Sequence, residues 1–228
     1  MNKKSVRVAE LFDIEVPYIA SLFDGAEFPW EVLPKIGAYC QRLIETGIEG
    51  FTEIMPGVLV GENVKIHPSA VIIAPAVIGA GTEIRPGAYL RGSVITGPDC
   101  VIGNSSELKN TVLMRRAQVP HYNYVGDSLL GNRAHMGAGA ICSNFKSDGS
   151  NVVVRGDESY ATGLRKMGAV LGDGAEIGCG CVLNPGTVIG KNTTVYPLTA
   201  VRGIVPAGVI VKSAAETVIK REKDKCAE

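Results

Sequence analysis

The chain of 228 residues has little aromatic content, no net charge and few histidines. Aromatic residues make up 6%, Lys plus Arg and Asp plus Glu number 23 each, and there are three histidines. Without a basic excess or a basic run, we expect no nucleic-acid partner. An interior with so few rings must be filled by aliphatic side chains, which favours a narrow core.

Long apolar runs and paired cysteines are also missing. No stretch is long enough to span a membrane, and no apolar stretch of signal-peptide length follows the basic start Met1–Lys4. The six cysteines include no Cys-x-x-Cys pair, and Cys100, Cys142 and Cys181 fall at repeat positions, where cysteine acts as a small hydrophobe. We therefore expect a cytoplasmic protein with no metal site.

What the chain does have is a large side chain at every sixth position from residue 54 onward. A helix repeats at about 3.6 residues and a strand at 2, so a period of six fits neither alone. The series runs Ile54, Val60, Ile66, Ile72, Ile78, Ile84, Leu90, Thr96, Ile102, Leu108 and Met114; then Tyr124, Leu130, Met136 and Cys142; then Leu171, Ile177, Leu183, Ile189, Val195 and Val201. This hexapeptide period predicts a parallel β-helix.

The period is interrupted twice, between Met114 and Tyr124 and between Cys142 and Leu171. Stacked coils bury their repeat residues only in register, so extra residues must bulge outward as loops, where functional groups tend to lie. The first interruption counts as four extra residues. Glycine often follows the large residue, as at Gly61 and Gly103, which we interpret as a tight corner with unusual backbone angles.

The period also divides the chain into three segments. Residues 1–53 lack it, and helical spacing from Trp30 to Thr46, interrupted early by Pro34, predicts a small helical cap over the first coil. Residues 54–212 form the β-helix. Residues 213–228 are charged and predicted to be a C-terminal helical tail.

Polar motifs gather around the first interruption. Ile84–Gly87 carries Arg85, and Glu107–Asn110 carries Lys109. His121 lies in Val119–Asp127, followed by Gly137-Ala138-Gly139 and then by Ser143-Asn144-Phe145. Arg and Lys commonly hold phosphate, a loop histidine can act as a general base near neutral pH, and a Gly-Ala-Gly backbone can offer N–H groups to an oxyanion.

From about residue 84 to 211 the chain resembles the acetyltransferase domain of bifunctional N-acetylglucosamine-1-phosphate uridyltransferase/glucosamine-1-phosphate N-acetyltransferase. The matching elements are IRPGA, ELK, H-x-x-Y-x-GD, GAG and SN, in family order. The resemblance, strongest to archaeal-type and stand-alone relatives, implies a left-handed β-helix that works as a homotrimer with sites between subunits. It also implies an acetyl-CoA-dependent N-acetyltransferase in amino-sugar nucleotide or cell-envelope biosynthesis, with an amino-sugar phosphate such as glucosamine-1-phosphate as acceptor.

The resemblance also implies roles for individual residues. His121 would take the proton from the sugar amine, Asn144 would contact the sugar and orient the amine, and the Ala138 N–H would bind the thioester oxygen. The sugar-phosphate site would include Arg85, Lys109, Tyr124 and His135, with Lys166 from a neighbouring subunit. The acetyl-CoA site would include Cys179, Pro197 and Lys212. No metal is required for this acetyl transfer.

The chain departs from the family pattern in three places. His135 replaces an asparagine, Phe145 replaces an aromatic hydroxyl, and no glycine-rich nucleotide-binding fingerprint precedes the repeats. We therefore expect no uridyltransferase activity. Two alternatives stay open: a non-catalytic trimeric protein that binds a sugar phosphate or sugar nucleotide, and a zinc carbonic anhydrase of this fold using His67, His121 and His135.

Overall fold

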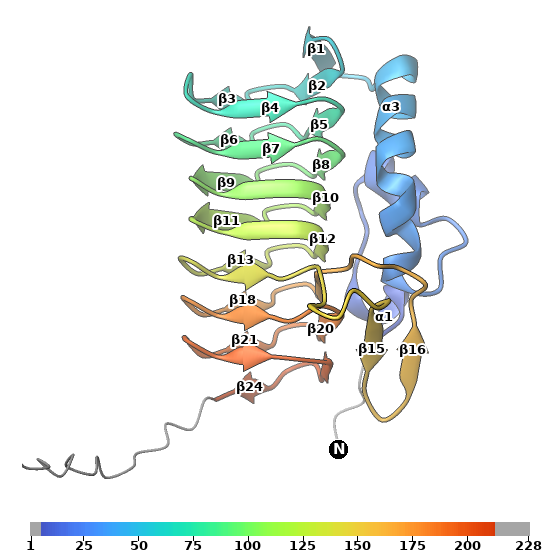
Figure 1. Ribbon diagram of the computed structural model, residues 1–228. Coiled ribbons are helices and arrows are strands. Elements are labelled where there is room, and N and C mark those ends of the chain that lie inside the picture. The colour runs from blue at the N-terminus through green and yellow to red at the C-terminus, as the bar shows by residue number, and fades with distance from the viewer. Residues whose placement is uncertain (1–5, 213–228) are drawn as a thin grey trace, which may run out of the picture.

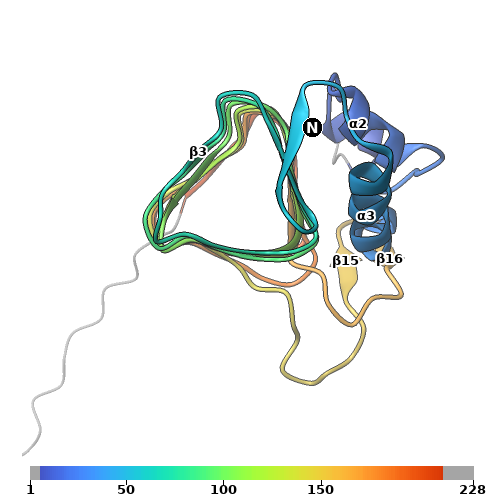
Figure 2. The ribbon, with the colours of Figure 1, turned by 90° about the horizontal axis from the view of Figure 1, so that it is seen from above.

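The computed structural model describes residues 6–212 and shows a three-sided prism of stacked coils with helices along one side (Figure 1, Figure 2). Each coil places a short strand on each side, and that strand pairs in parallel with the equivalent strand of the next coil. The predicted left-handed parallel β-helix of hexapeptide repeats is confirmed.

The three faces of the prism are named here by their strands. The first face holds β3 (Lys65–Ile66), β6 (Glu83–Ile84), β9 (Val101–Asn104), β11 (Gln118–His121), β13 (His135–Met136), β18 (Glu176–Ile177), β21 (Thr194–Val195) and β24 (Ile210–Val211). The second holds β4 (Val71–Ile73), β7 (Tyr89–Arg91), the first halves of β10 (Glu107–Leu113) and β12 (Tyr124–Leu130), β14 (Ile141–Cys142), β19 (Val182–Leu183) and β22 (Ala200–Val201). The third holds β2 (Val58–Gly61), β5 (Ala76–Ile78), β8 (Val94–Thr96), the second halves of β10 and β12, β17 (Ala169–Leu171), β20 (Thr187–Ile189) and β23 (Ile204–Val205).

Rows of aliphatic side chains fill the interior. On the first face, Ile84, Ile102, Val119 and Met136 occupy equivalent positions of successive coils and are at most 1% exposed. Burying one such side chain fully contributes about 1.5–3 kcal/mol. The gain requires a coil above and below, so the repeats stabilise one another.

Three predicted interior positions are wrong. Ile54 is 46% exposed, because it lies in β1 (Phe51–Met55), which pairs antiparallel with β2 at the end of the stack. The interior positions assigned to Met114 and Tyr124 belong to Leu113 and Val125.

The first interruption is therefore not an insertion. Leu108 pairs with Leu90, which is 18 residues earlier, whereas Val125 pairs with Leu108, only 17 residues earlier. The coil has lost one residue, and β10 and β12 run unbroken around the corner. His121 consequently lies at the end of a regular strand, β11.

The glycines that follow the large repeat residues serve a different purpose from the one predicted. Gly61 and Gly103 are absent from the residues with positive φ. A Cβ on Gly61 would come within 2.6 Å of the Ala80 nitrogen, and one on Gly103 would overlap the Pro120 carbonyl. These positions need glycine because the next coil passes directly over them.

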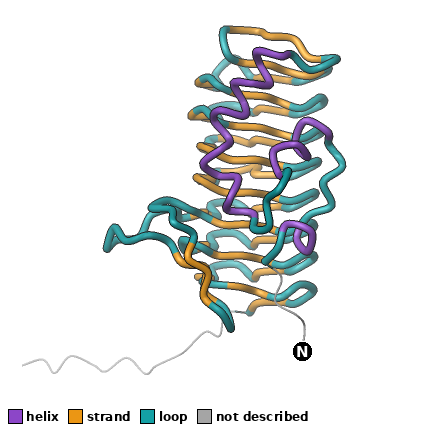
Figure 3. The backbone as a smooth tube through the Cα atoms, turned by 90° about the vertical axis from the view of Figure 1, so that its right-hand side faces the viewer, coloured by secondary structure: helices purple, strands orange, loops and turns teal. Residues whose placement is uncertain are grey.

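The N-terminal helices lie along the third face, and the prediction that they cap the first coil is wrong (Figure 1, Figure 3). They are α1 (Val8–Leu11), α2 (Pro17–Ala20), the 3-10 helices Ser21–Phe23 and Pro29–Lys35, and α3 (Ile36–Thr46). The outward row of the third face is apolar, and the helices of residues 6–46 together with the arm described below bury it: Leu59, Val77, Ile95, Val112, Leu129, Val170 and Val188. The helices bury this apolar row by packing along the third face, and this hydrophobic burial explains their position there rather than over the coil end.

The second interruption is a real insertion. Residues 145–168, called here the arm, leave the prism and form the hairpin of β15 (Val153–Arg155) and β16 (Ser159–Ala161) (Figure 2). A bridge between Phe145 and Lys166 closes its base. The predicted C-terminal helix lies outside the described residues. Within residues 6–212, no helix has the length and apolar character needed to cross a membrane.

Candidate active site

One corner of the prism carries four of the predicted site residues in a single column. His121 ends β11, and on the next coils the same corner position is taken by Ala138, Cys179 and Pro197. Hydrogen bonds link the coils: Gly139 N–H to the His121 carbonyl (3.0 Å), Gly180 N–H to Ala138 (2.8 Å) and Leu198 N–H to Cys179 (2.8 Å). All four residues are exposed. These residues are up to 76 positions apart in the sequence, but in the stacked coils each lies about 4.8 Å from the next. We call this set the His121 column.

A buried asparagine that the sequence did not single out fixes the corner at His121. Asn123 is 2% exposed, and its Oδ1 accepts a hydrogen bond from the His121 N–H (3.1 Å). Its Nδ2 donates to the carbonyl oxygens of Gly137 (2.8 Å) and Ala140 (3.2 Å) on the next coil. One side chain thus holds the backbone of His121 and the loop around Ala138 at a set spacing. The sequence signal for this role was the position of Asn123, two residues after His121.

At the next corner, Tyr124, Asp127 and Asn144 form a polar cluster. Asn144 Nδ2 donates to Asp127 Oδ2 (2.5 Å), and Asn110 Nδ2 donates to Asp127 Oδ1 (2.9 Å). Gly126 leaves room for the cluster, since a Cβ there would come 2.5 Å from Tyr124 Oη and 2.7 Å from Asn144 Nδ2. Asp127 has φ +47°, and its carboxylate accepts from both Asn144 and Asn110.

Burial raises the pKa of the Tyr124 phenol, and the nearby Glu107 carboxylate raises it further, while a hydrogen bond with Asn144 acts in the opposite direction. The phenol is therefore neutral at physiological pH and can donate a hydrogen bond to a ligand. Tyr124 and His121 are three residues apart, on either side of the corner where the second face begins.

A second cation, Arg91, lies one coil from Lys109, and the sequence analysis did not single it out. Leu108 pairs with Leu90, so Arg91 lies one coil from Lys109 on the same edge of the second face. Arg91 Nη1 contacts Glu107 Oε1 at 2.6 Å. Arg85 instead lies on the first face, with its Nε 3.1 Å from Glu83 Oε1. A single protomer does not bring Arg85 and Lys109 together at one point.

The remaining predicted residues lie around these two corners. His135 is on the first face, with Nδ1 3.0 Å from Glu176 Oε2. Lys166 is at the base of the arm, opposite Phe145, and Met167 N–H donates to the Asn144 carbonyl (3.0 Å). Lys212 Nζ lies 5.8 Å from the centre of the Tyr196 ring, beside Pro197. Within residues 6–212, no three His, Cys, Asp or Glu side chains form a metal-binding group.

These coils and this corner geometry place the protein among the hexapeptide-repeat left-handed β-helix proteins. A family model described as GMPPB C-terminal domain matches residues 72–163. This chain is 29% identical to the bifunctional protein GlmU of Methanococcus vannielii over 222 residues, which is 96% of this chain and 53% of that protein. It is 33% identical over 180 residues to GlmU of Nostoc sp., which is 77% of this chain and 36% of the relative.

The chain thus resembles bifunctional GlmU proteins, as its motifs predict, and it spans about half the length of the curated relatives it matches. Among solved structures, AntD, an N-acyltransferase from Bacillus cereus, is 18% identical with a TM-score of 0.40 and covers 77% of this chain and 93% of its own. WeeI from Acinetobacter baumannii is 21% identical with a TM-score of 0.38 and covers 64% of this chain and 52% of its own.

Proposed function

We propose that this protein is an acetyl-CoA-dependent N-acetyltransferase that acts on an amino-sugar phosphate such as glucosamine-1-phosphate. The observation that carries the proposal is the second face, which has the exposed His121 imidazole at one edge and Lys109 and Asn144 at the other. Tyr124 starts this face beside His121, and its hydroxyl reaches Asn144. The choice of acetyl transfer as the reaction rests on the motif resemblance to the GlmU acetyltransferase domain. The support from the geometry is that a candidate base, His121, and a candidate phosphate-binding cation, Lys109, lie on the same face.

In the proposed acceptor site, the sugar phosphate lies against Lys109 and Arg91. Arg91 is held by the Glu107 carboxylate on the neighbouring strand, so its guanidinium stays at this edge when the site is empty. The neutral Tyr124 phenol donates to a sugar or phosphate oxygen. Arg85 stays a prediction, to be tested separately, because its side chain pairs with Glu83 on the first face.

The chemical step proceeds at the start of the His121 column. The His121 imidazole takes a proton from the sugar ammonium, and the freed lone pair attacks the thioester carbonyl carbon. The Ala138 N–H forms no hydrogen bond within residues 6–212 and is free to stabilise the resulting oxyanion. The C–S bond then breaks, the imidazolium gives its proton to the departing thiolate, and the nitrogen releases its second ammonium proton to solvent as the amide forms.

The rest of the column suits an extended acyl carrier. Cys179 and Pro197 continue from Ala138 in steps of one coil, about 4.8 Å each. Lys212 lies beside the last of them and offers a cation to the phosphates of coenzyme A. We assign the pantetheine arm to this column, with the thioester at Ala138.

We also propose a homotrimer, in which a neighbouring prism supplies the second wall of the groove. The outward row of the second face carries large apolar side chains open to solvent: Val71 (53% exposed), Tyr89 (37%), Ile141 (37%) and Val182 (36%). Exposed apolar stripes of this kind mark interaction surfaces. Light scattering on purified protein checks the stoichiometry, and a monomer at micromolar concentration contradicts it.

A thiol-release assay tests the activity. Purified oligomer is mixed with acetyl-CoA and either glucosamine-1-phosphate or galactosamine-1-phosphate, and acceptor-dependent release of coenzyme A is the expected result. Absence of release with every acceptor, from folded protein that still binds them, identifies a non-catalytic binding protein instead. Uridyltransferase activity, which we propose this chain lacks, is measured in parallel with UTP and N-acetylglucosamine-1-phosphate.

A further inference from the structure

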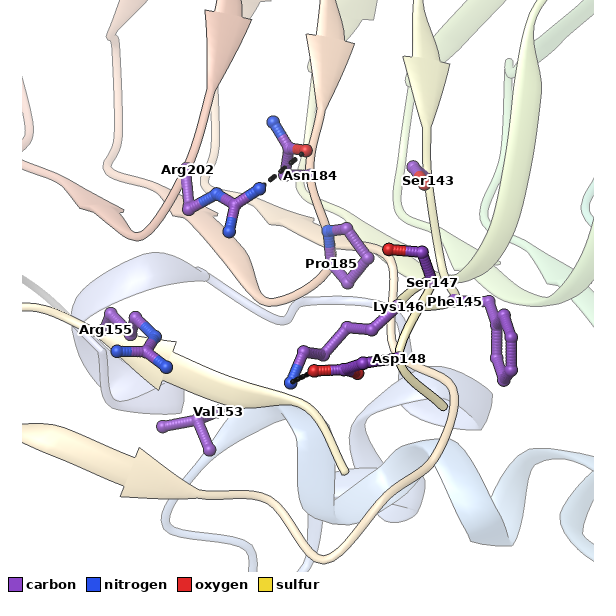
Figure 4. A pocket seen from close by; sticks show the side chains of 10 residues that line it. All are labelled: Ser143, Phe145, Lys146, Ser147, Asp148, Val153, Arg155, Asn184, Pro185 and Arg202. Atoms are coloured by element: carbon purple, nitrogen blue, oxygen red, sulfur yellow. Dashed lines mark hydrogen bonds and ion pairs between the residues drawn. The ribbon is translucent and has the colours of Figure 1, made fainter. Parts of the chain in front are cut away.

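A cavity of about 300 Å³ lies between the arm and the last coils of the prism (Figure 4). None of the residues assigned to acetyl transfer lines it. Its volume is at the lower end of the range for small-molecule sites. Phe145 and Pro185 form apolar parts of the wall, and Lys146, Asp148, Arg155 and Arg202 bring charge to it.

Glycines in the prism allow the arm to come close enough to form this cavity. Gly203 has φ +77°, and a Cβ there would overlap the carbonyl of Arg155. A Cβ on Gly186 would come 2.8 Å from Cγ1 of Val152, which is itself buried. Backbone packing of β15 against the coils, rather than a flexible side chain, therefore sets the spacing between Arg155 and Arg202.

The two arginines leave positive charge facing the cavity. Both lie at the same end of it in Figure 4. Within residues 6–212 neither guanidinium forms an ion pair with a carboxylate, and Arg202 Nη2 donates one hydrogen bond of 3.4 Å to Asn184 Oδ1. The Asp148 carboxylate is already engaged, by Lys146 Nζ at 3.4 Å and by the Ser150 N–H and hydroxyl.

We propose that this cavity binds a small phosphate monoester, with Arg155 and Arg202 on the phosphate and the organic body against Phe145 and Pro185. Guanidinium groups suit phosphate because they offer paired N–H donors in one plane. Lys109 and Arg202 occupy the same edge of the second face but lie four strand steps apart, from β10 to β22, or about 19 Å. Ser143 and Phe145 of the cavity wall flank Asn144, so the two sites adjoin there, but a phosphate on Arg155 and Arg202 is distinct from one on Lys109 and goes beyond the proposed function.

Calorimetric titration of the purified oligomer with inorganic phosphate and with glucose-1-phosphate tests this. Four proteins are compared: wild type, the double variant Arg155→Gln/Arg202→Gln, the acceptor-site variant Lys109→Gln, and Arg133→Gln as an exposed arginine elsewhere on the prism. Thermal unfolding of each confirms that it is folded. We expect the double variant to weaken phosphate binding at least tenfold and Lys109→Gln and Arg133→Gln to retain it.

Each other outcome overturns the proposal. Binding that is lost in Lys109→Gln but kept in the double variant places the phosphate in the acceptor site. Equal weakening in Arg133→Gln indicates general charge attraction, and no heat with either ligand at millimolar concentration indicates no site. Tighter binding of inorganic phosphate than of glucose-1-phosphate indicates a site for the free ion and not for a monoester.

Discussion

The Asp127 carboxylate holds Asn144 in place from one coil away, because Oδ2 of Asp127 accepts a 2.5 Å hydrogen bond from Nδ2 of Asn144. Its other oxygen accepts from Asn110, and the carboxylate is 7% exposed. Three coils are thus joined at one corner through a single buried charge. The arrangement fixes which way the Asn144 amide faces Tyr124, and therefore how the acceptor cluster is presented.

Replacing Asp127 by Asn should destabilise the fold and weaken acceptor binding together. The amide has one oxygen where the carboxylate has two, so it loses one of the two hydrogen bonds from half-buried Nδ2 groups, at a cost of about 1–3 kcal/mol. Urea unfolding measures the loss, and KM for the acceptor should rise. Asp99→Asn is the matched control, because the ion pairs of that carboxylate within residues 6–212 are exposed and worth at most about 1 kcal/mol. Equal stability of the two variants would contradict the assignment.

Replacing His121 by Ala should lower kcat by about 10²–10⁴ with little change in KM for acetyl-CoA, because the base acts on the amine and not on the thioester carrier. His67→Ala serves as the control, since that exposed ring pairs locally with Ser69 (2.8 Å). Steady-state thiol release measures both. Retention of the full rate in His121→Ala would reject the base role, and an equal fall in the control would point to a structural cause.

The period of six predicted the prism, because large side chains that recur at this period can all be buried only in the interior of a stacked coil. It did not predict that Val125, rather than Tyr124, faces inward. Two corners, Leu108–Leu113 and Val125–Leu130, are each one residue short, and a phase shift of minus two is the same as plus four in a period of six. A count along the chain therefore cannot separate lost corner residues from a bulge. The shift matters for function, since it moves Tyr124 out of the core and places His121 on a strand.

The clustering of the site was only partly predictable. His121 and Asn144 were found by motif, but Arg91 was missed because its partnership with Lys109 depends on strand register rather than on a motif. The members of the apolar outward row from Leu59 to Leu129 are 17 or 18 residues apart in the sequence, which is one coil. The meaning of this row, a face covered by helices, requires knowing which of three sides each position lies on.

Alkaline pH should destabilise the fold through its buried thiols. Burial raises the pKa of Cys40, Cys100 and Cys142 from 9.0 to about 12. As the pH rises, thiols of the unfolded chain ionise before the buried thiols do, which favours the unfolded state. The free energy of unfolding is therefore unaffected by these thiols below pH 9 and falls as the pH rises from 9 towards 12. Each group should cost roughly 1 kcal/mol at pH 10 relative to pH 8.

Urea unfolding at both pH values measures the alkaline effect, and Cys100→Ala should show a smaller loss between pH 8 and pH 10 than the wild type. Cys179→Ala should leave the loss unchanged, because that thiol is exposed in the folded protein as well. An identical pH dependence in Cys100→Ala and wild type would contradict the burial argument.

Thiol labelling should report directly on the proposed acetyl-CoA column. Among the five cysteines within residues 6–212, Cys179 is exposed and the other four are buried. In a Cys226→Ser background, iodoacetamide should therefore modify Cys179 first in the native protein, and coenzyme A should slow that reaction by covering the column. Mass spectrometry of peptides follows the labelling.

The modified Cys179 should also change the kinetics in a specific way. A carboxamidomethyl group at this corner lies one coil from Ala138, so it should raise KM for acetyl-CoA severalfold while KM for the acceptor, bound at the Lys109 edge, stays the same. Cys179→Ser, which is not alkylated, controls for modification elsewhere. Full labelling without any change in KM for acetyl-CoA, or labelling that coenzyme A does not slow, would place the carrier on a different edge of the prism from the one that begins at His121.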